Sequence, residues 1–175
     1  MTSPTNSAPS AGARRPFILK RELNAPQALV FKAWTEQERL HRWFGPRGLT
    51  YVRGTCNLTA GGVAHYCLRT PDNDEMWGKW IFCDILEPER LIFVNSFSDE
   101  AGMLVRHPMN PEWPLQMLTT LVLSESAPNR TSLQLHWTPY DATPSEYAAF
   151  EAGFAGMDRG WGGTMEQLEA YLAGG

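Results

Sequence analysis

The sequence predicts an α+β fold in which a curved antiparallel sheet wraps around a long C-terminal helix, with two short helices after the first strand. Short segments along the chain alternate apolar and polar residues, as half-buried strands do. Tight turns join most of these segments, which is typical of an antiparallel meander. The last segment, Thr143–Leu172, instead places its apolar residues at helical spacing. The sequence shows no βαβ alternation, which is the pattern that would indicate a parallel sheet.

The first strand is expected at Phe17–Leu23, which alternates in the manner of a strand with one buried face. Asn24-Ala25-Pro26 then opens a helix, whose packing residues are Leu29, Val30, Ala33 and Trp34. Thr35 and Glu38 have the spacing of a capping box. They predict a second short helix, which ends at Gly45-Pro46.

From Leu49 onward the pattern predicts six further strands, separated by turns rich in Gly, Pro, Asn and Asp. The expected strands are Leu49–Leu58, Val63–Thr70, Met76–Leu86, Leu91–Phe97, Gln116–Leu123 and Thr131–Thr138. One face of such a sheet would hold the long helix, and the other face would meet solvent.

The connection Ser98–Pro114 is much longer than the other turns and still carries Met103, Leu104, Met109 and Trp113. A long loop with apolar residues is often a lid or a binding loop. Two interpretations stay open at this point: the loop gates a site, or it folds back and packs on the core.

The C-terminal segment has the local features of one long helix. Thr143 suits the N-cap, Pro144 suits the first helical position, and Glu146 completes a capping box. At about 100° per residue, the apolar residues share one stripe. They are Phe150, Phe154, Met157, Trp161, Met165, Leu168 and Leu172.

Four glycines form a second, narrow stripe on the same helix: Gly153, Gly156, Gly160 and Gly163. A glycine inside a helix costs roughly 1 kcal/mol relative to alanine, so the stripe needs an explanation. Strand backbone could approach the helix closely there, or the glycines could leave space for a ligand. A kink near Gly160–Gly163 is a third interpretation.

The composition restricts the classes of function. A chain of 175 residues, 43% hydrophobic and 19% charged, fits one globular domain, expected at residues 16–175 after a disordered tail at 1–15. The net charge of −4, with scattered Arg and Lys, argues against nucleic acid as a partner. No apolar run approaches the ~20 residues that span a bilayer, so no membrane partner is expected. Three cysteines without a C-x-x-C motif favour reduced thiols and a cytoplasmic location.

The sequence predicts neither a metal site nor a catalytic nucleophile, and it implies no cofactor. The histidines lack ligand spacing, and alternation places His65 and His136 on the solvent face of the sheet. No G-x-S-x-G motif is present. The polar groups available for general acid–base chemistry are Tyr66, Asn95, Gln116 and Asp158.

Five segments together resemble the START-like (SRPBCC) helix-grip superfamily, and within it the branch named for the activator of heat-shock-protein ATPase homologues. They are VFKAWTEQERLHRWFGP at 30–46, GG at 61–62, ILEPERLIF at 85–93, HPMNPEWPLQMLTTLVL at 107–123 and GMDRGWGGTMEQLEAYL at 156–172. The resemblance covers nearly everything from residue 16 to the end.

This resemblance implies a cavity between the sheet and the C-terminal helix. Similar members are proposed to bind small hydrophobic or aromatic molecules, and a few superfamily relatives are cyclases. The branch has no universal catalytic motif. The eukaryotic co-chaperones that name it carry an additional N-terminal domain, which this sequence does not show, so we do not expect direct action on a chaperone ATPase.

We therefore expect a protein that binds a small hydrophobic or aromatic molecule between sheet and helix. Ala64 and the glycine stripe both remove volume from that layer, and Tyr66 and Asn95 would supply hydrogen bonds. The expected ligand-binding residues are Tyr66, Trp80, Phe82, Phe93, Asn95, Trp113, Trp137, Phe154, Met157 and Trp161.

Two other functions stay open. A cyclase- or aromatase-type enzyme acting on a polyketide-like substrate would need a buried polar residue with a shifted pKa beside the cavity. A chaperone-associated stress-response protein would need an exposed apolar patch and no cavity. A homodimer is compatible with all three functions.

Overall fold

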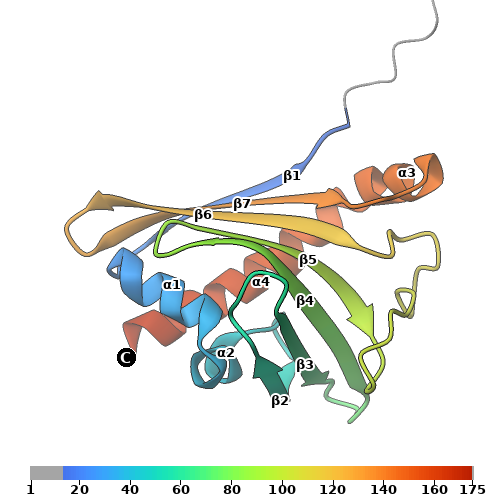
Figure 1. Cartoon of the computed structure of the whole chain (residues 1–175), viewed down its shortest axis with the longest axis horizontal. Helices are drawn as coiled ribbons and strands as arrows, with labels where there is room; N and C mark the ends of the chain where they lie inside the picture. Colours follow the sequence, from blue (N-terminus) through green and yellow to red (C-terminus); the bar gives the residue numbers. More distant parts are fainter. Residues whose placement is uncertain (1–13, 175) are drawn as a thin grey trace, which may run out of the picture.

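The computed structural model describes residues 14–174 and shows a single curved sheet wrapped around the last helix (Figure 1). The expected tail at residues 1–15 therefore lies almost wholly outside the described residues. The elements are β1 (Phe17–Leu23), α1 (Gln27–Thr35), α2 (Gln37–Trp43), β2 (Thr50–Cys56), β3 (Val63–Arg69), β4 (Glu75–Leu86), β5 (Arg90–Ser98), β6 (Met117–Ala127), β7 (Arg130–Pro139), α3 (Pro144–Ala152) and α4 (Phe154–Ala173).

The seven strands form one antiparallel sheet in the order β1-β7-β6-β5-β4-β3-β2. The consecutive strands from β2 to β7 are neighbours, as their short turns predict. β1 instead pairs with β7, from Phe17 opposite Trp137 to Leu23 opposite Thr131. The predicted α+β class, with two short helices after the first strand and a helix gripped by the sheet, is confirmed.

Bulges in β4 and β2 accompany the curvature of the sheet. The register shifts between Phe82 and Asp84 in β4 and between Tyr51 and Arg53 in β2. A bulge bends its strand and increases the local twist. Figure 1 shows β4 and β5 running steeply away from the nearly level β6 and β7, so that the sheet surrounds α4 on two sides.

One end of the enclosed space is filled mainly by aliphatic side chains. Alternate residues of β6 and β7 point inward and are fully buried, among them Leu121, Leu133 and Leu135. Helices α1 and α4 cover them with Phe31, Trp34, Met165 and Leu168. Burying one such side chain contributes about 1.5–3 kcal/mol, so this end contributes much of the stability of the fold.

The prediction of a capping box at Thr35 and Glu38 is wrong. Helix α1 runs through Thr35, whose hydroxyl donates to the Phe31 carbonyl at 2.9 Å. Helix α2 starts after Glu36, which makes no side-chain capping bond. A threonine at the end of a helix can bond back four residues as readily as it can cap the next helix, and here the first alternative holds.

The C-terminal segment is two helices rather than one. The expected cap is confirmed: Thr143 and Glu146 form a capping box at the start of α3. The break lies at Gly153, whose carbonyl accepts from the amides of Gly156 and Met157 at 2.9 and 3.0 Å and so starts α4. Helix α4 then continues unbroken through Gly160 and Gly163 to Ala173.

The glycine stripe has no single explanation. A Cβ on Gly153 would lie 2.8 Å from the Trp113 ring, and one on Gly163 would lie 3.3 Å from the Arg47 backbone nitrogen. A Cβ on Gly156 or Gly160 would have no described neighbour within 4 Å. The stripe therefore marks neither contact with a strand backbone nor the border of a pocket.

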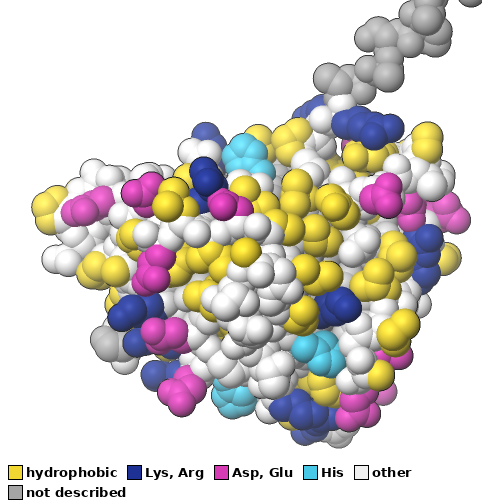
Figure 2. Space-filling model, in the orientation of Figure 1, with side chains coloured by type: hydrophobic (Ala, Val, Ile, Leu, Met, Phe, Trp, Pro, Cys, Tyr) yellow, Lys and Arg dark blue, Asp and Glu magenta, His cyan; other side chains and the backbone are white. Residues whose placement is uncertain are grey.

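The outer face of the sheet is less polar than the alternation suggests. The register places Val63, Ile81, Val94 and Leu118 in one row across four strands. Figure 2 shows hydrophobic side chains gathered over β5 and β6. The outer face also carries His65, which stacks on Trp77 with ring centroids 4.8 Å apart.

Candidate ligand-binding site

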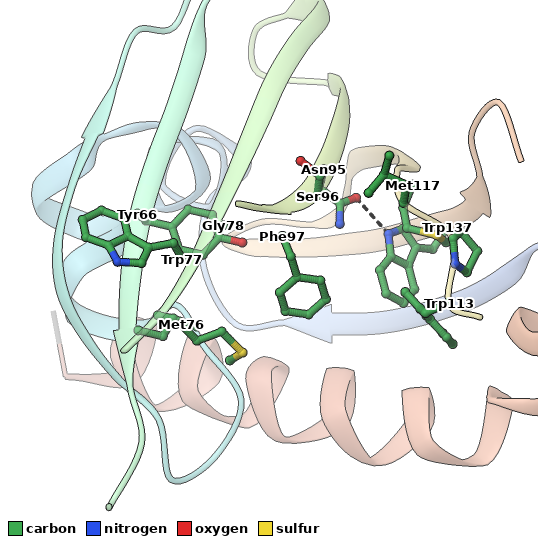
Figure 3. Close-up of a pocket in the computed structure, with 13 residues that line it drawn as sticks. Tyr66, Met76, Trp77, Gly78, Asn95, Ser96, Phe97, Trp113, Met117 and Trp137 are labelled. Atoms are coloured by element: carbon green, nitrogen blue, oxygen red, sulfur yellow. Dashed lines mark hydrogen bonds between the residues drawn. The ribbon is translucent and has the colours of Figure 1, made fainter. Parts of the chain in front are cut away.

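A pocket of about 110 Å³ lies at the end of the enclosed space that aliphatic side chains do not fill. Strands β3, β4 and β5, the end of the 98–114 loop, the start of β6 and the end of β7 surround it (Figure 3). The side chains that face it are mainly apolar or aromatic: Tyr66, Leu68, Met76, Asn95, Phe97, Trp113, Pro114, Leu115, Met117 and Trp137.

The strand register explains why these residues meet. Tyr66 pairs with Gly78, and Gly78 pairs with Phe97, which gives one inward-facing row. The next row runs through Trp80, Asn95 and Met117. Because side chains two residues apart on a strand share a face, the pocket lies over the first row and beside the second.

Gly78 gives Tyr66 the space that it occupies. A Cβ on Gly78 would lie 2.6 Å from both the Tyr66 hydroxyl oxygen and the adjacent ring carbon. The ring also packs edge-on against Phe44 and Trp80, with centroids 5.2 and 5.7 Å away. Burial raises the pKa of the Tyr66 phenol, and the Trp80 indole opposes that rise. The phenol is therefore neutral at pH 7 and able to donate a hydrogen bond.

Asn95 is the polar group at the centre of the site. Its Oδ1 accepts from the Thr119 hydroxyl at 2.7 Å and from the Trp137 indole nitrogen at 2.9 Å. An indole N–H can only donate, so the accepting atom must be the amide oxygen. Figure 3 shows the amide nitrogen turned toward the space between the Phe97 and Trp137 rings.

An aromatic cluster forms the wall on the side of α3. Trp113 lies 5.9 Å from Trp137 and 5.8 Å from Phe150, measured between ring centroids. Trp137 also contacts Trp161 of α4 at 5.6 Å. Trp113 belongs to the long loop, and it lies against the backbone of Gly153 at the junction of the two C-terminal helices.

The 98–114 loop is attached to three elements. The Lys79 ammonium donates to the Gly102 carbonyl at 2.8 Å, and the Val105 amide donates to the Phe97 carbonyl at 3.2 Å. The Arg106 guanidinium pairs with Glu146 of α3. Hydrogen bonds from Arg106 hold the pKa of the Glu146 carboxyl below its ordinary value of 4.5. The loop thus packs back and supplies a wall of the pocket.

The predicted site residues fall into two groups. Tyr66, Asn95, Trp113 and Trp137 line the pocket. The other six do not line it: Trp80, Phe82 and Phe93 are at most 2% exposed in the core, and Phe154, Met157 and Trp161 pack from α4 against other aromatic and aliphatic side chains. Met157 is buried, and the other two are half-buried.

Sequence reasoning missed several lining residues, including Leu68, Met76, Phe97 and Met117. Phe97 lies two residues beyond Asn95 on the same strand, so the alternation alone could have identified it as inward-facing. Pro114 and Leu115, which follow Trp113, show no periodicity, and no pattern would have placed them.

The pocket is uncharged. None of its lining residues is acidic, basic or a histidine. Within residues 14–174, no group of three or more His, Cys, Asp and Glu side chains could hold a metal ion. In the same range, no helix is both long enough and apolar enough to cross a membrane. Binding in this pocket would therefore depend on apolar contact and neutral hydrogen bonds.

Comparison with known proteins agrees with the fold. Residues 24–173 match the family described as Activator of Hsp90 ATPase homolog 1-like protein. No curated protein matches the chain.

Solved structures with the same architecture come from several bacteria. A protein of Arthrobacter aurescens is 29% identical, with a TM-score of 0.73, over 91% of this chain and 87% of that one. A Nitrosomonas europaea protein is 26% identical, with a TM-score of 0.72, over 92% and 96%. The AHSA1 protein of Silicibacter pomeroyi is 15% identical, with a TM-score of 0.66, over 91% and 98%, and shows likeness of fold alone.

Proposed function

This chain belongs to the family of Activator of Hsp90 ATPase homolog 1-like proteins, and from that premise we propose that it binds a small hydrophobic or aromatic molecule in the pocket beside Asn95. The observation that carries the proposal is the pocket itself. Its walls are apolar and aromatic, and few polar groups converge on it, which is the composition typical of small-molecule sites.

The size of the pocket limits the ligand. Sites for drug-sized molecules usually enclose about 300–1,000 Å³, and this pocket encloses about 110 Å³. The proposal is therefore a ligand with one ring or a short chain. A multi-ring, polyketide-like substrate would not fit without moving Trp113 or Trp137.

The chemistry of the lining favours binding over catalysis. General acid–base catalysis needs a group that can exchange a proton near neutral pH. Among the lining residues, only Tyr66 has a titratable side chain. Burial raises the pKa of its phenol, so the phenol stays protonated and does not act as a base at pH 7. Asp158 is exposed on α4 and is not part of the lining. A cyclase would need a base that these residues do not supply.

Nuclear magnetic resonance tests the proposal directly. Ethylbenzene titrated into the purified protein should shift the indole N–H signals of Trp113 and Trp137 in a saturable manner. Phe97→Trp should weaken that response, because the larger ring occupies the pocket. Val122→Ile, on the outer face, is the matched control and should respond as the unchanged protein does. Absence of a saturable response in the unchanged protein would contradict the proposal.

A further inference from the structure

The hydrogen bonds that Asn95 makes leave its side chain with free donors only. A side-chain amide oxygen has two lone pairs, and its nitrogen has two N–H donors. Thr119 and Trp137 already donate to Oδ1, at 2.7 and 2.9 Å. No described residue accepts from Nδ2, which faces the pocket (Figure 3). Asn95 therefore presents donors to the pocket and no free acceptor.

The orientation of the amide is fixed from both sides. Rotating it by 180° would place an N–H group against the Trp137 N–H and the Thr119 hydroxyl, and would lose the bond from the indole, which cannot accept. The three residues come from adjacent strands β5, β6 and β7, so the backbone holds their spacing. The donor is thus pre-organised before a ligand arrives.

The rest of the lining disfavours charged ligands and ligands that place a donor against Asn95. A charged ligand would leave water for a pocket without any counter-charge, which is costly. An amine would direct its own donors at the amide donors of Asn95. Tyr66, neutral at pH 7, adds a hydroxyl that can donate to the same acceptor, and the fixed donor of Asn95 sets which ligand group lies at the centre of the site.

We infer that the pocket selects an uncharged, single-ring molecule with a carbonyl or similar hydrogen-bond acceptor, to which Asn95 Nδ2 donates. This inference rests on the proposed function, because it concerns the same pocket. It adds the class of ligand and names the residue that recognises it.

A matched pair of probes isolates the hydrogen bond. Acetophenone and ethylbenzene have nearly the same shape, and they differ in a carbonyl oxygen. The quantity to measure is the ratio of their dissociation constants, ethylbenzene over acetophenone, in each variant. Asn95→Leu should lower this ratio roughly tenfold, equivalent to about 1.4 kcal/mol. Damage to the fold would weaken both probes and leave the ratio unchanged.

Asn95→Asp gives a second, sharper variant. Its carboxylate keeps acceptors for Thr119 and Trp137 but replaces the donor by a second acceptor. At pH 8, acetophenone should lose affinity, and benzylammonium should gain affinity over its binding to the unchanged protein. The Asn95 side-chain NH₂ signals, identified by their loss in this variant, should move when acetophenone binds the unchanged protein.

The outcomes separate the two claims. A fall of the ratio in Asn95→Leu, with reversed preference in Asn95→Asp, supports the inference. Binding of both probes with the same ratio in every variant would overturn it and leave the proposed function standing. Failure of every probe to bind the unchanged protein would overturn both.

Discussion

Thr119 and Trp137 hold the Asn95 amide from the two strands beyond it. Thr119 is fully buried, and its hydroxyl makes the shorter of the two bonds to Oδ1. A hydrogen bond made by a buried hydroxyl contributes modestly to the free energy of unfolding. Leaving a buried polar group without its partner lowers that free energy by more. Thr119 is therefore both a core residue and a positioning residue for the pocket.

Thr119→Val tests this role at the residue scale. The change keeps the shape of the side chain and removes the donor, so we expect the free energy of unfolding to fall by about 1 kcal/mol. At this chain length, that corresponds to roughly 2–4 °C in Tm. Thr138→Val is the control, because Thr138 lies half-buried on the outer face and makes no side-chain hydrogen bond among the described residues. Equal losses in the two variants would contradict the assigned role.

Sequence reasoning could find inward-facing residues but not the ones that border empty space. Asn95 and Trp80 are cross-strand partners on the same inner row, and alternation predicts both equally well. Trp80 is closed off by Trp34 of α1, with centroids 6.1 Å apart, and by Phe44 at 5.0 Å. These neighbours are distant in sequence, so the difference between a core ring and a pocket wall depends on tertiary packing.

The junction of α3 and α4 shows the same limit for a whole element. The capping box at Thr143 and the apolar stripe depend on residues close in sequence, and the start of α3 was predicted correctly. At the break, Trp113 arrives from the loop and lies against Gly153. Helical periodicity cannot predict a contact with a residue of a distant loop. The sequence therefore shows that the glycines are unusual for a helix, but it does not locate the break.

Two glycine substitutions test this account. Gly160→Ala should raise the free energy of unfolding by about 0.5–1 kcal/mol, because alanine is the better helix former and its Cβ would enter open space. Gly153→Ala should lower it, because its Cβ would lie 2.8 Å from the Trp113 ring and displace that ring. Thermal unfolding measures both, and the Trp113 indole signal should shift in Gly153→Ala alone. The same sign for both substitutions would argue against this explanation of the break.

At the scale of the molecule, the enclosed space is built in two parts. Its aliphatic end joins α1, α4 and the strands β6 and β7, and its aromatic end lies under the 98–114 loop. The predicted strands and turns determine the first part, because they are local in sequence and their inward residues pack directly on the helices. The second part depends on a loop without periodicity, and its attachment by Arg106 to Glu146 follows no pattern that a sequence reveals.

That attachment makes the stability of the molecule depend on pH. Arg106 holds the pKa of Glu146 below 4.5, so the ion pair stabilises the folded state above that pH. The stabilisation is lost as the pH falls from 4.5 through the folded-state pKa, where the carboxyl takes up a proton. Glu146→Gln removes the charge and keeps an oxygen that can accept the capping bond from the Thr143 amide.

We therefore expect Glu146→Gln to have a lower Tm than the unchanged protein at pH 7. The difference should correspond to at most about 1 kcal/mol, because Arg106 is half exposed and water screens the pair. It should shrink steadily below pH 4.5, because protonation removes the same charge from the unchanged protein. Glu151→Gln, on the exposed side of the same helix, is the control and should show no such convergence. If the Tm difference in Glu146→Gln were constant from pH 7 to pH 3, the ion pair would not be what joins the loop to the helix.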